Sequence, residues 1–251
     1  MKRDALLATL DEWLQPHLIS DYCPNGLQVE GCVEIKHIIT GVTASQRLLD
    51  AAVKAGADTV LVHHGYFWKG EDNRVIGMKQ RRLRTLLMAD INLIGYHLPL
   101  DIHPEFGNNA QLLQRLGASE ISAVSGPKPD GVLMQGYLPS ACSGYELADQ
   151  LETMLERTLV AVELNEQPIQ RIAVCTGGGQ SFIEQAYQSG ADAFITGEVS
   201  EQTIHVAREC GIQFFAAGHH ATERYGVKAL GERIAENFDI AVDFLDMDNP
   251  A

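Results

Sequence analysis

The sequence has little positive charge and no long apolar run. It holds 19 lysines and arginines against 33 aspartates and glutamates, which gives a formal net charge of −14. That balance argues against a general binder of nucleic acid or anionic membrane, because such proteins present a basic face. No apolar run approaches the roughly 20 residues that cross a bilayer, and the first residues lack the apolar core of a secretion signal. We therefore predict a cytoplasmic protein that binds no membrane and for which nucleic acid is an unlikely partner.

Cysteine is also scarce, and its five residues follow no metal-binding pattern. The number is odd and no C-x-x-C pair occurs. These facts suit a reducing compartment and argue against a disulfide framework and against a thiolate metal site. Any metal site must therefore use nitrogen and oxygen ligands.

The pattern of apolar runs predicts two similar α/β domains that arose by internal duplication. A strand at 37–40, a helix that ends near Gly56 and a strand at 59–62 form a first strand–helix–strand unit, typical of a parallel sheet. The order recurs as a strand at 171–175, a helix at 181–189 and a strand at 193–196. Both passages contain Gly-Ala-Asp before the second strand, at 56–58 and at 190–192.

The most favourable boundary lies where proline and glycine crowd together, at 125–131. We predict a first domain at 1–125 and a second at 126–251, and the second carries an added strand-like and helix-like segment at 131–156. Two halves built alike predict a metal site in the cleft between them.

Three groups of histidines and acids each follow an apolar run that is typical of a buried strand. They are His63 with His64, His97 with Asp101, and His219 with His220 and Glu223. Imidazole nitrogen and carboxylate oxygen suit zinc, iron, manganese or nickel, and these residues do not distinguish the four. The fold must bring such distant groups together, so the pattern predicts metal binding.

The spacing within the second and third groups is the same, but the local geometry need not be. His219 and Glu223 share one face if a helix begins at residue 219. Pro99 disfavours helix at the residue before it and predicts a loop between His97 and Asp101. His97 and His220 are interpreted as residues that orient the ligands.

Two segments are candidates for phosphate contacts, although each has a simpler interpretation. The stretch 69–84 gathers six lysines and arginines, which are more often a solvated helix face. The glycines at 177–179 separate a strand from a helix, where amides could hold phosphate or only make a tight turn.

The motifs of the chain, taken together, resemble those of one family. Their order is kept along the sequence: Asn25-Gly26-Leu27-Gln28-Val29-Glu30-Gly31, Gly41-Val42-Thr43, His63-His64-Gly65, His97 to Asp101, Gly107-Asn108-Asn109 and Gly218 to Glu223. The chain resembles the GTP cyclohydrolase 1 type 2 homologues, also called the Nif-three-like family, over nearly its whole length. One departure is Gly65, where many relatives have proline.

The resemblance implies a dinuclear metal centre in a toroidal homohexamer. Carried over by position, the ligands are His63, His64, Asp101, His219 and Glu223, and His97 moves to a supporting role. Five ligands leave open positions on two metals, so a water that bridges them is the expected nucleophile. Asp101 or Glu223 is a possible bridging carboxylate, and no general base is assigned.

Two functions remain open at this point. The first is metal-dependent hydrolysis of a nucleotide-like substrate, with cyclohydrolase chemistry as one form of it. The second is a non-catalytic protein that handles metal or regulates an assembly, because no separate nucleophile and base stand out in the sequence.

Overall fold

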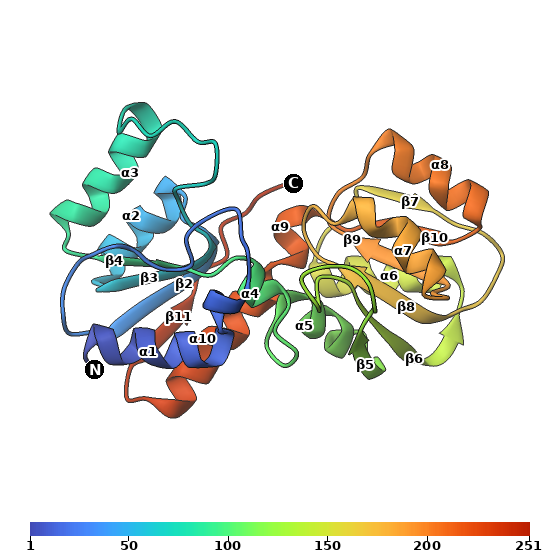
Figure 1. Cartoon of the computed structure of the whole chain (residues 1–251), viewed down its shortest axis with the longest axis horizontal. Helices are drawn as coiled ribbons and strands as arrows, with labels where there is room; N and C mark the ends of the chain where they lie inside the picture. The colour runs from blue at the N-terminus through green and yellow to red at the C-terminus, as the bar shows by residue number, and fades with distance from the viewer. The chain divides into compact units, whose positions relative to one another are not determined.

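The computed structural model describes residues 1–251, which fold as two compact units of strands and helices (Figure 1). Unit 1 contains Met1–Leu100 and Gly226–Asp248, and unit 2 contains Asp101–Tyr225 and Asn249–Ala251. Each unit has its own sheet, so the predicted class of two α/β domains is confirmed. The chain passes between the units at other points than the predicted boundary at residues 125 and 126, because residues 101–125 pack with the second sheet and residues 226–248 with the first.

The sheet of unit 1 has five strands, and four of them run parallel. In spatial order they are β1 (Gly26–Val29), β4 (Asn92–Gly95), β3 (Thr59–His64), β2 (His37–Thr43) and β11 (Ala241–Phe244). The edge strand β1 pairs antiparallel with β4, and the other neighbours are parallel. The central strands β3 and β4 are buried almost throughout, as a sheet with helices on both faces requires.

Helices cover both faces of this sheet. On one face, α2 (Gln46–Ala55) and α3 (Gly77–Met88) bury leucines against the strands, and α1 (Arg3–Leu14) and α10 (Arg224–Asn237) lie on the other face (Figure 1). Helix α2 begins at Ser45, whose side chain accepts the Leu48 amide, and it ends at Gly56 in the left-handed conformation. A 3-10 turn (Pro16–Leu18) follows α1.

The sheet of unit 2 has six strands around a parallel centre. Their order is β5 (Ser119–Ala123), β6 (Met134–Cys142), β8 (Ile169–Cys175), β9 (Ala193–Thr196), β10 (Gln213–Ala216) and β7 (Ala161–Glu163). Strands β8, β9 and β10 are parallel, and the other pairs are antiparallel.

The helices of unit 2 also form two layers. Leucines of α5 (Asn108–Arg115) and α6 (Gly144–Leu155) pack in one core cluster, while α7 (Ile183–Gln188) and α8 (Glu201–Cys210) contribute to a second cluster. Alternate residues of β8 enter the two clusters, because neighbouring side chains of a strand point to opposite faces. A short α9 (His219–Thr222) follows β10, and a 3-10 turn (Gln180–Phe182) precedes α7.

The repeat seen in the sequence has a structural basis in two aspartates. Asp58 Oδ2 accepts the amides of Lys36 and His37 at 2.7 and 3.1 Å. Asp192 Oδ2 accepts the amides of Gln170 and Arg171 in the same way, at 2.9 and 2.7 Å. Each carboxylate therefore fastens the start of one parallel strand beside the next, and β2–β3–β4 corresponds to β8–β9–β10.

One local expectation was wrong, and two further features were not predicted from the sequence. Residues 98–101 form a short helix, α4 (Leu98–Asp101), where a loop was predicted, because proline is tolerated in the first turn of a helix. Residues 219–237 form two helices, α9 and α10, which are divided at Glu223. Strands β5 and β7 are short and largely exposed, so they lack a clear apolar pattern. No helix of the structure has the length and apolar character to span a membrane.

Candidate metal centre

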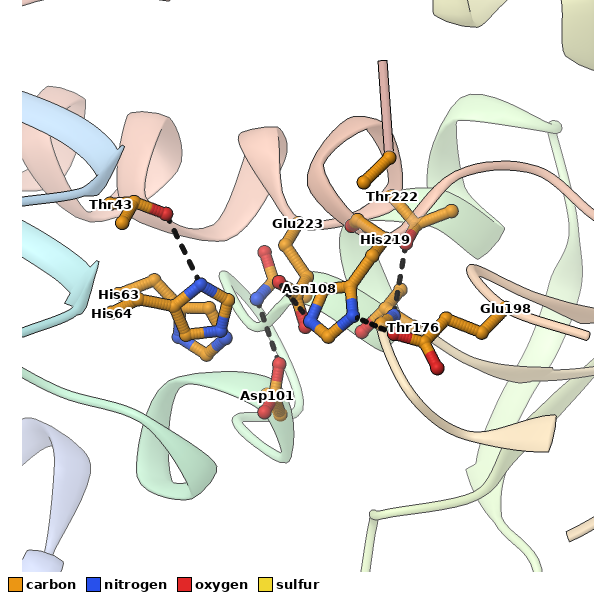
Figure 2. Close-up of polar contacts among 12 residues, drawn as sticks. Thr43, His63, His64, Asp101, Asn108, Thr176, Glu198, His219, Thr222 and Glu223 are labelled. Atoms are coloured by element: carbon orange, nitrogen blue, oxygen red, sulfur yellow. Dashed lines mark hydrogen bonds and ion pairs between the residues drawn. The ribbon is translucent and has the colours of Figure 1, made fainter. Parts of the chain in front are cut away.

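The two adjacent histidines of unit 1 lie at the carboxyl end of β3, where parallel sheets commonly place functional residues. His63 is fully buried, and its Nδ1 lies 3.0 Å from the carbonyl oxygen of Tyr96. A carbonyl only accepts, so Nδ1 carries the proton and Nε2 is the nitrogen with metal-ligand character. The Nδ1 of His64 lies 3.3 Å from the Thr43 hydroxyl at the end of β2 (Figure 2).

His97 joins this pair through a carboxylate that fixes its ring. Its Nδ1 lies 2.7 Å from Asp21 Oδ1, while Asp21 Oδ2 accepts the amide of Leu98 at 2.9 Å. One ring nitrogen each of His63, His64 and His97 lies within 4.8 Å of the others. Bonds of about 2.0–2.2 Å to a divalent ion fit donor atoms at such separations. The three histidines of unit 1 can therefore hold a metal ion.

The candidate ligands of unit 2 are centred on His219 at the start of α9. Its Nδ1 lies 2.7 Å from Glu198 Oε1, and its Nε2 lies 3.3 Å from Glu223 Oε2, four residues further on (Figure 2). Burial opposes the protonated ring, but the hydrogen bonds and charges of Glu223 and Glu198 outweigh it and raise the pKa of His219 to about 9. Two carboxylates therefore create a strong site for positive charge, which a proton or a metal ion can supply.

Glycines allow these side chains to approach the strand ends. Gly177 follows β8 with φ of +62°, and a Cβ there would meet Glu223 Oε1 and His219 Nε2. A Cβ at Gly197, directly after β9, would lie 2.6 Å from the Gly177 carbonyl oxygen and from the His219 Cα. The amide of Gly177 donates to Thr222 Oγ1 at 3.0 Å, which holds α9 against this turn.

Asp101, the last residue of α4, is buried and is oriented by an amide. Asn108 Nδ2 donates to Asp101 Oδ1 at 2.8 Å (Figure 2). The neighbouring Asn109 donates to the carbonyl oxygens of Gly131 and Val132 and accepts the Thr176 amide. The paired asparagines thus connect Asp101 and the end of β8 to the same segment of unit 2.

The predicted site residues fall into two sets. His63, His64 and His97 belong to unit 1, whereas Asp101, His219, His220 and Glu223 belong to unit 2. His220 is buried within α9. Asp101 is the first residue after the chain leaves unit 1, and Glu223 lies shortly before the chain returns there at Gly226. Two of the three chain crossings therefore lie at or near a candidate ligand, and the third, after Asp248, does not.

Neither candidate for phosphate gains support. Within the basic stretch, Arg74 pairs with Asp72 at 2.7 Å and Lys79 lies 3.5 Å from Glu71. The glycine turn uses its Gly177 amide for Thr222, and the Glu198 carboxylate lies near Gly178. A carboxylate beside the turn repels an anion, and Gly177 instead allows the close approach of Glu223 and His219.

Four supporting residues were not assigned from the sequence: Asp21, Thr43, Asn108 and Glu198. Glu198 had a signal, because the internal repeat sets it opposite His64. Asp21 lies in a loop, Thr43 ends β2 and Asn108 begins α5, and only the fold shows that their side chains meet Nδ1 of His97, Nδ1 of His64 and Asp101.

Comparison with known proteins gives full-length matches. The family model Duf34/NIF3 (NGG1p interacting factor 3) matches residues 1–250. A Vibrio cholerae protein named GTP cyclohydrolase 1 type 2 homolog is 55% identical over 247 residues, which cover 98% of each chain. The solved structure of protein ybgI, of unknown function, has a TM-score of 0.95 at 54% identity over 100% of both chains. That of TTHA1606 from Thermus thermophilus has a TM-score of 0.91 at 32% identity, again over 100% of both chains.

Proposed function

The chain belongs to the DUF34/NIF3 family, and from that premise we propose that it is a dinuclear-metal protein that hydrolyses a nucleotide-like substrate. The proposed ligands are His63, His64, Asp101, His219 and Glu223. The observation that carries the proposal is that the ligand histidines each have Nδ1 engaged by a partner, as metal-bound imidazoles have in proteins. His97 and His220 are proposed to support this set.

The course of the chain supports one shared centre. Asp101 and Glu223 lie at or near two of the three crossings between the units, so these candidate carboxylates of unit 2 are close in sequence to unit 1. His97 lies four residues before Asp101 on the same passage.

The residues of the chain would divide the work as follows. Two divalent ions, when bound, would supply an activated water at neutral pH and would polarise the group under attack. The buried Asp101 and Glu223 are the side chains able to bridge two ions, and Asn108 and Glu198 hold Asp101 and His219 in place. Asp21 holds the ring of His97 toward His63 and His64.

The cysteines offer no competing nucleophile near these residues. Burial and the charges of Asp101 and Glu223 raise the pKa of the Cys175 thiol, which keeps it protonated. Burial, together with the charge of Asp21, raises the pKa of Cys23 to about 12. Thiolate attack is therefore disfavoured, and chemistry at this site depends on the metal. The lack of a reactive thiol near these residues also favours the second candidate function, a metal-handling protein without turnover.

We also propose a cytoplasmic homohexamer. Helix α3 and the residue before it leave Ile76, Met78, Leu87 and Met88 more than half exposed, which is typical of a surface that another copy covers. Light scattering should give a mass about six times the 27.5 kDa chain. A monomeric mass would exclude the ring.

Elemental analysis of the purified protein tests the metal centre. We expect about two metal ions per chain, and a loss of metal in His63→Ala and in Glu223→Ala. His205→Ala removes an exposed histidine of α8 and is the matched control. Full metal content in both site variants would contradict the proposed ligands.

Assay of the metal-loaded protein against a nucleotide panel then separates the two functions. Turnover that is lost in His63→Ala and kept in His205→Ala supports the hydrolase. Loaded protein that turns over nothing, yet passes its metal to an apo acceptor, supports metal handling.

A further inference from the structure

Two aromatic side chains of unit 1 flank the ring of His97. The Trp68 ring centroid lies 4.9 Å from that of His97 at an interplanar angle of 80°, and the Tyr22 ring lies 6.3 Å away at 64°. Trp68 also lies 5.8 Å from the ring of His64. Both aromatic rings therefore stand directly beside the histidines proposed to serve the metal centre.

Hydrogen bonds hold the backbone of the two loops that carry these rings. The loops that carry them are joined, because the Lys69 amide donates to the Tyr22 carbonyl oxygen at 2.6 Å. The Trp68 indole N–H donates to the Gly65 carbonyl oxygen at 3.1 Å, and its amide donates to Glu71. Phe67, the preceding residue, has φ of +64°, a strained value for an aromatic residue that is found mainly where function requires it.

The Tyr22 ring remains 62% exposed although its backbone is held on both sides. A rigid, exposed aromatic ring at a steep angle to a histidine offers a flat apolar face at little entropic cost. Two cations of the following segment are already paired, Arg74 with Asp72 and Lys79 with Glu71. The surface therefore suits a flat ring better than a phosphate group.

We propose that Tyr22 and Trp68 form an aromatic wall that stacks on the heteroaromatic ring of the substrate. The proposal rests on the proposed function, because it places a nucleobase-like ring beside the metal-binding histidines. Stacking on aromatic side chains tolerates every base, so the wall selects a class of flat ring rather than one nucleotide.

The chain has two tryptophans, Trp13 and Trp68, which allows a direct test. In Trp13→Phe, Trp68 is the only tryptophan, and its emission reports on the wall alone. Guanosine 5′-monophosphate should quench it saturably, with and without prior removal of metal by a chelator, and ribose 5-phosphate should not. Calorimetry on otherwise unchanged protein should show binding of guanosine 5′-monophosphate weakened about 10-fold in Trp68→Leu and in Tyr22→Leu.

Two variants control this test. Trp68→Phe keeps a ring and should retain most of the affinity, and Tyr145→Leu removes another exposed tyrosine, from α6 of unit 2, and should change nothing. Equal binding of ribose 5-phosphate, or full affinity in Trp68→Leu, would overturn the wall. Metal content is measured on the same samples. If the protein binds the ring but holds no metal, the aromatic wall is supported and the proposed hydrolase is contradicted. If it holds metal but binds no ring, the wall is contradicted and the proposed hydrolase is not.

Discussion

The two units share one plan of strands but place their candidate ligands differently. In unit 1, the middle strand β3 ends in His63 and His64, whereas the matching residues after β9 of unit 2 are Gly197 and Glu198. At the end of the first strand, Thr43 of unit 1 corresponds to Gly177. Both units place a histidine after the third strand, His97 in unit 1 and His219 in unit 2, but only unit 1 also has histidines at the end of the middle strand.

This difference shows which parts of a duplicated fold can change. Asp58 and Asp192 keep the same two amide bonds, because they align the parallel strands on which each sheet depends. The residues at the carboxyl ends of the strands do not align the sheet in this way, so they can differ between the units. There, glycine in unit 2 makes room for α9, and Glu198 binds His219 from the position that His64 holds in unit 1.

The largest expected effect comes from filling the space that only unit 2 leaves open. In Gly197→Ala, the new Cβ meets the backbone at Gly177 and His219, which cannot move without shifting α9. We expect a loss of about 1–3 kcal/mol in the free energy of unfolding, together with loss of metal. Urea denaturation followed by circular dichroism, with elemental analysis, measures both.

Gly178→Ala is the matched control, because a Cβ there would lie 3.8 Å from the nearest atom, in ordinary contact. If Gly197→Ala and Gly178→Ala were equally stable and equally loaded with metal, close packing of α9 on the strand ends would not explain the glycines of unit 2.

The second prediction compares the groups that hold the two histidine sets. Glu198 makes a charged hydrogen bond of 2.7 Å to His219, while Thr43 makes a neutral contact of 3.3 Å to His64. Charged bonds are about twice as strong as neutral ones. Glu198→Ala should therefore weaken metal binding by roughly 10–100-fold, and Thr43→Val by only a few-fold.

Competition with a chromophoric chelator measures both affinities. Glu198→Gln keeps an acceptor oxygen without the charge and should fall between the wild type and Glu198→Ala. A larger effect of Thr43→Val than of Glu198→Ala would show that unit 1 dominates the binding energy, contrary to the expected contrast between the units.

Much of the fold followed from apolar periodicity, because long buried strands such as β3 and β8 leave an unmistakable pattern. The repeat was visible through Gly-Ala-Asp at 56–58 and 190–192, where one side chain has the same structural task twice. The short edge strands β5 and β7 were missed, since exposed residues carry no pattern. Pro99 predicts a loop, but it lies in the first turn of α4, where proline is tolerated, so the sequence does not reveal this helix.

The site was predictable in its candidate ligands and not in its support. Histidines and acids after apolar strands signal metal chemistry by residue type alone, as His63 and Glu223 do. Asp21 and Asn108 act through hydrogen bonds to partners 76 and 7 residues away, and neither their residue types nor the Gly107-Asn108-Asn109 motif indicates which group each side chain meets. The internal repeat shows that β9 of unit 2 corresponds to β3 of unit 1. Only the structure shows that Glu198, after β9, contacts His219.

The smallest expected effect is the difference between two matched variants, one in each unit. Because both should lose the same protection, this difference tests the equivalence of the units most directly. Asp58→Ala should free the amides of Lys36 and His37, and Asp192→Ala those of Gln170 and Arg171. Each loss should cost about 1–2 kcal/mol locally, because two donors lose a charged acceptor. Hydrogen exchange should therefore quicken about 10-fold at the start of β2 in one variant and of β8 in the other. Asparagine at either position keeps an acceptor oxygen and should restore most of the protection. If one aspartate proved dispensable while the other did not, the shared hydrogen bonds would be a remnant of the duplication rather than its common support.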